Sequence, residues 1–250
     1  MQPIEINHRP LASGERSIAE RVEAMAWPRI EAELAEQGWA TTGRLLSSSE
    51  CAALASAYES DQQFRSRVIM ARHGYGRGEY KYFAYPLPAF VADLCTSLYR
   101  RIAPTANRWD QLLHRSADFP AEHDDYLRRC HQAGQLRPTP LLLRYTEGDY
   151  NCLHQDLYGE LLFPLQVAFL LSAPGEDFTG GEFVLTEQRP RMQSRASVVP
   201  LIQGEGVVFA VNHRPVQGTR GTYRVTMRHG VSRLRSGQRF TLGIIFHDAK

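Results

Sequence analysis

Apolar residues in the first half of the chain recur at the three- to four-residue spacing of one helix face. Ile18, Val22 and Met25 begin this pattern, which continues through Leu34 and stops at Gly38. A glycine just past the last periodic residue is a common helix terminator. The pattern therefore predicts helical structure that ends at Gly38.

Local signals predict three further helices before residue 137. Ser47 with Glu50 three residues later is a capping-box pattern, in which the two residues satisfy each other's backbone N–H at the start of a helix. The predicted helices cover residues 47–58, 90–102 and 121–130. Pro104 should end the second of them, because proline lacks the N–H that a helix interior requires.

The segment from Arg65 to Tyr85 alternates basic and aromatic residues. It contains Arg65, Arg67, Arg72, Arg77 and Lys81, interleaved with Tyr75, Tyr80, Tyr82, Phe83 and Tyr85. Such a mixture can hold a phosphate backbone and stack bases, which would make nucleic acid a partner. It can equally form a hairpin lid whose aromatic rings pack on the core, and we favour the hairpin.

After Pro138 the pattern changes to short apolar runs separated by glycine turns, which is typical of strands. The predicted strands cover residues 140–145, 151–156, 165–171, 181–186, 197–201, 207–211, 223–229 and 240–247. Many short strands predict a mainly β fold with flanking helices, built on a jelly roll or double-stranded β-helix. We expect a helical support or lid over residues 1–137 and the jelly-roll core over residues 138–250.

The net charge of +2 hides an uneven distribution. Residues 188–239 contain ten arginines and one acidic residue, whereas residues 1–187 contain 18 basic and 25 acidic residues. An anionic substrate such as nucleic acid would explain this basic block. A solvated arginine-rich rim explains it as well, and we slightly favour the rim.

The remaining composition indicates a cytoplasmic protein with no membrane partner. No CxxC pair occurs among the four cysteines, which are Cys51, Cys95, Cys130 and Cys152. Their irregular spacing predicts reduced thiols. Residues 1–5 lack the basic start of a secretion signal. The longest apolar run, residues 161–173, is interrupted and too short to cross a bilayer.

Candidate chemistry centres on the string His154-Gln155-Asp156. On a strand, residues i and i+2 share a face, so the imidazole and the carboxylate can point at one site. His229 would complete a two-histidine, one-carboxylate set, which suits non-haem Fe(II) that activates O2. Arg239, ten residues later, can bind a carboxylate through a bidentate pair.

Each of these assignments has an alternative. His154 and Asp156 can form a simple hydrogen-bonded couple within a strand. His213 also precedes a Gly-x-Arg string, so it competes with His229 as third ligand. We favour His229, because a long apolar strand follows Arg239, and we then place His213 in a loop near the mouth of the site, where it can contact substrate. His247 is interpreted as an ordinary residue at a strand end.

The order of the motifs resembles the Fe(II)/2-oxoglutarate dioxygenases, and within them the prolyl-4-hydroxylase-like branch. The resemblance covers about residues 138–248. It consists of Tyr-x-x-Gly at 145–148, His-x-Asp at 154–156, Gly-Gly-Glu at 180–182, Gly-x-x-Val-x-Phe at 204–209, His229 and Gly-x-Arg at 237–239. Residues 149–158 are also similar to a bacterial family of oxygenases predicted to act on damaged nucleic acid.

The resemblance implies a role for each candidate residue. The iron ligands would be His154, Asp156 and His229. Arg239 would pair with the distal carboxylate of 2-oxoglutarate, with Thr241 adding a hydrogen bond and Tyr145 reaching the co-substrate. The implied reaction consumes O2, converts 2-oxoglutarate to succinate and CO2, and hydroxylates a second substrate.

The second substrate stays open between a protein side chain, implied by the prolyl-hydroxylase branch, and an alkylated nucleobase. One departure bears on this choice. Alkylated-DNA-repair dioxygenases place their co-substrate arginine much farther past the distal histidine than Arg239 lies past His229. This spacing puts a demethylase activity in doubt without excluding nucleic acid. A non-catalytic jelly-roll module that binds a metal or ligand is the alternative from another class.

Overall fold

The computed structural model describes residues 16–115, 118–219 and 221–250. Residues 1–5, on which the expectation about a secretion signal rests, lie outside this range. The helices are α1 (Ile18–Glu23), α2 (Trp27–Gln37), α3 (Ser48–Ala57), the short 3-10 helix η1 (Met70–Arg72), α4 (Ala89–Leu112) and α5 (His123–Gln132). The first strands are β1 (Trp39–Arg44), β2 (Phe64–Ile69), β3 (Gly76–Arg77) and β4 (Glu79–Phe83).

Ten further strands follow in the second half of the chain. They are β5 (Leu141–Thr146), β6 (Tyr150–His154), β7 (Leu165–Leu170), β8 (Phe178–Gly180), β9 (Phe183–Gln188), β10 (Arg195–Val199), β11 (Glu205–Ala210), β12 (His213–Gly218), β13 (Gly221–Val231) and β14 (Leu234–Ile244). All of the strands predicted after Pro138 are present, with shifted ends.

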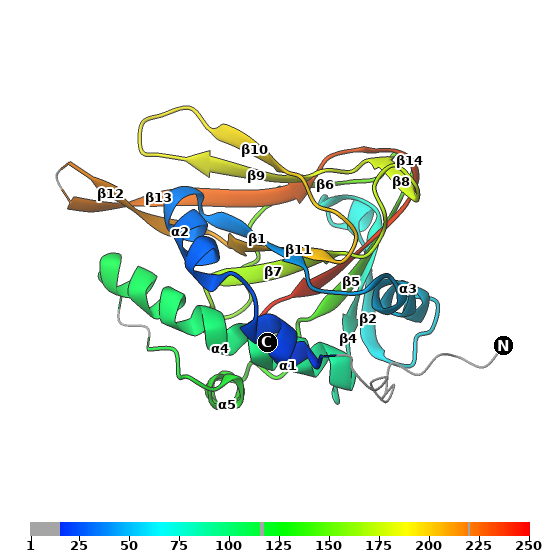
Figure 1. Cartoon of the computed structure of the whole chain (residues 1–250), viewed down its shortest axis with the longest axis horizontal. Coiled ribbons are helices and arrows are strands. Elements are labelled where there is room, and N and C mark those ends of the chain that lie inside the picture. The colour runs from blue at the N-terminus through cyan, green and yellow to red at the C-terminus, as the bar shows by residue number, and fades with distance from the viewer. Residues whose placement is uncertain (1–15, 116–117, 220) are drawn as a thin grey trace.

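The strands form two antiparallel sheets that pack face to face (Figure 1). The larger sheet has the order β1-β11-β7-β14-β5-β4-β2, with β8 beside β14. The smaller sheet has the order β10-β9-β13-β6-β3, with β12 beside β13. Apolar residues of both sheets meet between them, including Phe183 and Leu185 from β9 and Phe209 from β11. The predicted fold class, a mainly β jelly roll with helices, is confirmed.

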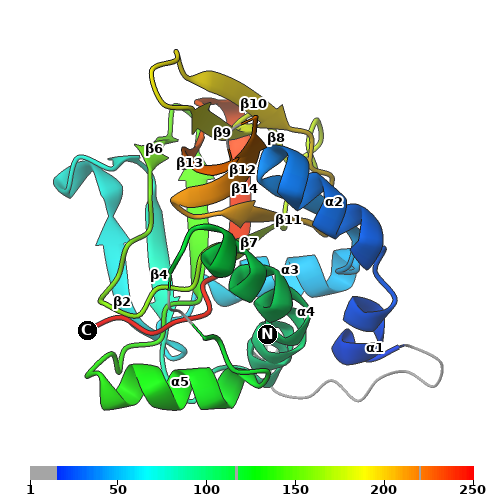
Figure 2. The ribbon, with the colours of Figure 1, turned by 90° about the vertical axis from the view of Figure 1, so that its left-hand side faces the viewer.

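Strand β14 has one face toward the main hydrophobic cluster and the other face toward a cavity. Its Phe240, Leu242 and Ile244 join the main hydrophobic cluster, which also contains most buried residues of the helices. The alternate residues Arg239 and Thr241 line a cavity on the other face. Figures 1 and 2 show helices α1, α3 and α4 on the side of the larger sheet away from the smaller one.

Local signals in the first half correctly predicted the start of α3 and the end of α2. The Ser47–Glu50 capping box is present at the start of α3. Gly38 terminates α2 in the left-handed conformation, with φ of 82°. The expected helical stretch is broken once, between α1 and α2, because Pro28 occupies the first turn of α2 and cannot donate a backbone hydrogen bond.

Two expectations about the first half need correction. Helix α4 does not end before Pro104 but continues to Leu112. Its long buried face, from Val91 to Trp109, outweighs the cost of the missing backbone hydrogen bond, about 3 kcal/mol. The first half also contributes four strands. Strands β1, β3 and β4 pair directly with strands that follow residue 138, and β2 pairs with β4 at the edge of the larger sheet. The division into two regions at residue 138 stays a prediction.

The segment from Arg65 to Tyr85 forms the favoured hairpin, with β2 and β4 paired antiparallel. Four of its five basic residues have partners inside the protein. The Nε of Arg65 donates to the carbonyl of Pro138 at 2.9 Å, Arg67 pairs with Glu79, and the buried Lys81 pairs with Asp61. Arg77 is exposed and its Nε lies 3.7 Å from Oδ1 of Asp149, and Arg72 is exposed as well. The hairpin therefore offers fewer cations to a partner than its sequence suggests.

The segment after β6 is held by one buried side chain, Gln135. Its Nε2 donates to the carbonyls of Tyr158, Leu161 and Asp248 at 3.4, 3.1 and 2.5 Å. Its Oε1 accepts from the N–H groups of Glu160 and Leu161 at 3.0 and 2.9 Å. One side-chain amide thus supplies hydrogen bonds to backbone groups that a neighbouring strand would otherwise supply.

His247 lies beyond the end of β14 and is fully buried, so it is not the ordinary strand-end residue we expected. Its Nδ1 accepts a hydrogen bond from the N–H of Phe163 at 3.2 Å. Burial lowers the pKa of His247 to about 4, with a small opposing effect from Asp156. The imidazole is therefore neutral in the folded protein at neutral pH.

Two further expectations concern the compartment. All four cysteines are unpaired, with Cys152 exposed and the other three buried. In the described part of the chain, none of the helices has the length and apolar character needed to cross a membrane.

We predict that Gln135→Ala lowers the free energy of unfolding by about 3 kcal/mol, because several buried backbone groups lose their hydrogen-bond partner. Urea unfolding measures the change. Gln132→Ala is the matched control, since Gln132 is the exposed last residue of α5. This substitution should alter the free energy of unfolding by less than about 0.5 kcal/mol. Equal effects of the two substitutions would contradict the role of Gln135 in holding the segment after β6.

We predict that His247 makes the protein less stable as pH falls from 6.5 to 4. In this window the unfolded chain binds a proton on His247 that the folded chain does not, so the free energy of unfolding falls by up to about 3 kcal/mol. His247→Asn removes this contribution, and urea unfolding of the metal-free proteins at pH 7, 5.5 and 4.5 tests it. A wild-type curve parallel to that of the variant would refute the assignment.

Candidate metal centre

The three candidate ligands come from two neighbouring strands and the loop between β6 and β7. His154 is the last residue of β6, and His229 lies directly opposite it on β13. The strands can approach closely here because Gly230 has no side chain, and a Cβ at this position would lie 2.7 Å from the carbonyl oxygen of Asn151. Asp156 lies two residues beyond His154.

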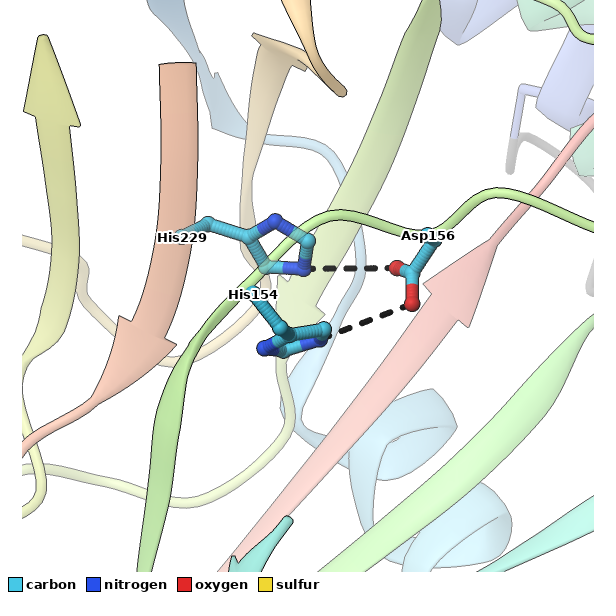
Figure 3. Close-up of side chains that lie close together, drawn as sticks. All are labelled: His154, Asp156 and His229. Atoms are coloured by element: carbon cyan, nitrogen blue, oxygen red, sulfur yellow. Dashed lines mark ion pairs between the residues drawn. The ribbon is translucent and has the colours of Figure 1, made fainter. Parts of the chain in front are cut away.

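The two imidazoles face one carboxylate (Figure 3). The Nε2 of His229 is 3.3 Å from Oδ2 of Asp156, and the Nε2 of His154 is 3.5 Å from Oδ1. One ligand atom from each residue lies within 4.8 Å of the other two. His213 and His229 were the two candidates for the third ligand, and the structure brings His229 to His154 and Asp156.

The position of Asp156 differs from the prediction. Strand β6 ends at His154, so the two-residue period of a strand does not place the carboxylate. Side chains fix this loop instead. The Nε2 of Gln155 donates to the carbonyls of Asn212 and Met227 at 3.2 and 2.8 Å, and the Tyr158 hydroxyl donates to Oδ1 of Asp156 at 2.8 Å.

Electrostatics keep the carboxylate charged. Burial alone would raise the pKa of Asp156, but the two imidazoles outweigh burial and hold it well below its ordinary value. Burial and the neighbouring His154 lower the pKa of His229. Burial also acts to lower the pKa of His154, but contact with Asp156 outweighs it and the net pKa is raised. A buried carboxylate between two imidazoles is an environment that stabilises a bound divalent cation.

The hydrogen bonding of the histidines fits a metal ion. The Nδ1 of His154 lies 2.7 Å from the carbonyl of Cys152, to which it donates when protonated. This bond places the free lone pair of the neutral ring on Nε2, the atom that faces Asp156. Nitrogen, nitrogen and carboxylate oxygen are donors that Fe(II) accepts in a facial arrangement.

Arg239 occupies the same cavity and is 1% exposed. Its Nη1 donates to the Thr241 hydroxyl at 2.6 Å, while its Nε has no hydrogen-bond partner among the described residues. Its Cζ lies 5.6 Å from the ring centre of Tyr145. Burial lowers the pKa of Arg239 to about 10. A buried guanidinium without a carboxylate partner can accept one from a ligand.

The cavity has a volume of about 330 Å³. All six predicted site residues line it, namely Tyr145, His154, Asp156, His229, Arg239 and Thr241. His213 does not; it begins β12, and its Nδ1 lies 3.3 Å from Arg115. The expectation that His213 lies in a loop near the mouth is therefore wrong, and Arg220 of its Gly-x-Arg string lies outside the described residues.

The sequence profile of one protein family matches residues 78–249, which include every cavity-lining residue except Tyr75. The family is described as "Oxygenase, catalysing oxidative methylation of damaged DNA". The chain belongs to this oxygenase family. It is therefore an oxidoreductase, as the resemblance implied. The comparisons give no support to the alternative of a non-catalytic module.

This oxygenase is also similar to proteins that share its sequence or its fold. Two uncharacterized proteins of Mycobacterium tuberculosis are each 51% identical to it over 167 residues, which make up 67% of this chain and 72% of each relative. A prolyl-4-hydroxylase of Pseudomonas putida superposes with a TM-score of 0.52 at 14% identity, over 94% of this chain and all of that one.

A prolyl hydroxylase of Trichoplax adhaerens, solved with a hypoxia-inducible-factor peptide fragment, superposes with a TM-score of 0.58 at 12% identity, over 92% of both chains. At such low identity these likenesses concern the fold alone. They confirm that the oxygenase has the prolyl-hydroxylase type of jelly roll that its motifs predicted.

Some residues of the site were not predicted from the sequence. Phe183 and Phe209 pack against the ring of His229, with centroid distances of 6.0 and 4.7 Å. Both belong to strand motifs, so alternation could have placed them inside. Asn151 donates to the Tyr145 hydroxyl at 3.4 Å. The contact of Tyr158 with Asp156 has no sequence signal, because it depends on the path of a loop.

Proposed function

We propose that this oxygenase depends on Fe(II) and 2-oxoglutarate and that His154, Asp156 and His229 bind the iron. The observation that carries the proposal is the presence of this ligand set and a buried, partly unpartnered Arg239 in one cavity. Family membership supports an oxygenase, and the two-histidine, one-carboxylate set is the arrangement used by Fe(II) oxygenases.

Arg239 and Thr241 would hold the distal carboxylate of 2-oxoglutarate. A guanidinium and a hydroxyl on one face of β14 can donate together to one carboxylate, and burial strengthens the pairing by excluding water. The Tyr145 hydroxyl lies on the adjacent strand, since Tyr145 pairs with Arg239 in the register of β5 and β14. From there it can add a third hydrogen bond to the co-substrate.

The bound iron would supply the activation of O2, with 2-oxoglutarate converted to succinate and CO2 and the primary substrate hydroxylated. The chain itself orients the reactants and keeps the cavity dry. Phe183 and Phe209 shield His229 from solvent, and its side chain is 9% exposed. The side chain of His154 is more exposed, at 33%.

We further propose a damaged base in a nucleic acid as the primary substrate. The description of the family supports this choice over a protein side chain, because the likeness to prolyl hydroxylases concerns only the fold. Tyr75 lines the cavity while its side chain is 50% exposed, and it stacks on His73 at 5.3 Å. Aromatic platforms of this kind bind bases, and the exposed Arg72 and Arg77 can bind phosphates.

Two coarser expectations also remain proposals. We propose that residues 1–137 support the jelly-roll core, since Gln135 holds the loop after β6 and β4 pairs with β5. We also propose a cytoplasmic location, which the four unpaired cysteines favour.

We predict that the metal-free protein, given Fe(II) and 2-oxoglutarate without O2, develops the weak visible charge-transfer band of the chelate. On admission of air it should release succinate. Arg239→Lys should raise the KM for 2-oxoglutarate by about 30-fold or more, because the loss of a bidentate buried pair costs at least about 2 kcal/mol. Arg235→Lys, at an exposed position of the same strand, is the matched control.

Histidine variants separate the metal assignment from the general proposal. His229→Ala should lose the charge-transfer band, whereas His213→Ala should keep it, because only His229 lies in the cavity. If His213→Ala were the variant that lost the band, the ligand assignment would be wrong. If wild-type protein gave neither band nor succinate, the enzyme mechanism would be wrong.

We predict that Tyr75→Ala weakens binding of a single-stranded oligonucleotide with an alkylated base by about 1–3 kcal/mol, the worth of one stacked base. Tyr75→Phe should bind like wild type. Neutralising Arg72 and Arg77 together should lower the slope of log affinity against log salt by about 1–2. Fluorescence anisotropy at several salt concentrations measures both effects.

A protein side chain as the primary substrate would give the opposite result. Succinate release that is stimulated by a proline-containing peptide, with no oligonucleotide binding at physiological salt, would refute the nucleic-acid proposal. Arg65 and Arg67 are unsuitable for this test, because their partners are inside the protein and their loss would disturb the hairpin.

A further inference from the structure

The loop that carries Asp156 has little backbone support. Residues 155–164 connect β6 to β7 without helix or strand structure. His154 and His229, by contrast, are fixed by the ladder between β6 and β13. The position of the carboxylate therefore depends on side-chain contacts, and a residue that supplies such a contact can control the metal centre.

Tyr158 supplies the shortest of these contacts to the carboxylate. Its hydroxyl donates to Oδ1 of Asp156 at 2.8 Å. The other oxygen, Oδ2, is the one that lies 3.3 Å from Nε2 of His229. Oδ1 also lies 3.5 Å from Nε2 of His154, so each oxygen faces one imidazole, but only Oδ1 accepts the hydrogen bond of the phenol. Oδ2 therefore keeps its lone pairs available for a metal ion.

The ring of Tyr158 is itself held from the first half of the chain. It packs edge-on against Tyr82 of β4, with a centroid distance of 6.5 Å and an interplanar angle of 88°. Tyr82 is 8% exposed, and the guanidinium carbon of Arg65 lies 4.4 Å above its ring. The backbone carbonyl of Tyr158 accepts from Gln135 at 3.4 Å. The phenol therefore has few other positions available.

We propose that Tyr158 is a positioning residue that orients the Asp156 carboxylate, so that Oδ2 is the oxygen that ligates the metal. The proposal rests on the metal centre proposed above and deepens it. Without the hydroxyl, the carboxylate is free to rotate about its terminal bond and to present either oxygen. Groups that orient a ligand in this way commonly change metal affinity by about 10- to 100-fold when they are removed.

The test compares wild type, Tyr158→Phe and Tyr80→Phe in anaerobic titrations with Co(II), a spectroscopically visible substitute for Fe(II). Tyr80 is the matched control, because it lines the same cavity and packs against Tyr82 but has no hydrogen bond to Asp156. We expect Tyr158→Phe to bind Co(II) about 10- to 100-fold more weakly and to show an altered visible ligand-field spectrum. Tyr80→Phe should match wild type in both measurements.

The outcomes distinguish this inference from the proposed function. Wild-type affinity and spectrum in Tyr158→Phe would overturn the inference while leaving the metal centre intact. No binding of Co(II) by wild type would instead overturn the metal centre. Circular dichroism and thermal unfolding of the metal-free proteins test the fold, and a Tyr158→Phe chain that does not fold would show a structural role and overturn the inference.

A double-mutant comparison provides an independent check. Asp156→Ala removes the acceptor altogether, so adding Tyr158→Phe to it should cause no further loss of Co(II) affinity if the hydroxyl acts through Asp156. A second loss as large as that in the wild-type background would show that Tyr158 affects the metal by another route, and the inference would be wrong.

Discussion

The pairing of β6 with β13 is the constraint on which the site depends, because it places His229 opposite His154. A shift of this register by one residue would turn every side chain of one strand to the other face of the sheet. The pairing of β13 with β9 fixes the register from the other side, with His229 opposite Leu185. Two imidazoles therefore meet over the cavity with no adjustment left to the side chains beyond their rotamers.

The chemistry was predictable where it lies on regular strands and less so where it does not. Arg239 and Thr241 share a face of β14, so their spacing of two residues already indicated a common site. The two-residue period of a strand also predicted that His154 and Asp156 meet. They do meet, but the strand ends at His154, so its period is not the cause. Sequence periodicity carries no information about a loop, and for the same reason it could not identify Tyr158.

The fold shows the same division between local and distant effects. Capping of α3 by Ser47 depends on residues within one turn, and the sequence predicted it. Strand β1 depends on β11, whose residues pair with Trp39 and Ala40 from far along the chain, and no local pattern revealed it. Pro104 is tolerated inside α4 because tertiary packing outweighs a local preference. Tertiary contacts decided each of the expectations that failed.

Charge illustrates why counting residues is a weak guide to partners. The basic block of residues 188–239 suggested a broad cationic surface, but Glu187, just outside it, pairs with Arg189, Arg195 and the buried Arg214. Arg239 faces the cavity, where it can serve only a ligand inside. Several of the ten arginines are thus unavailable to a polyanion at the surface. An electrostatic attraction for nucleic acid would have to come from exposed cations near the entrance, such as Arg72 and Arg77 on the hairpin that carries Tyr75.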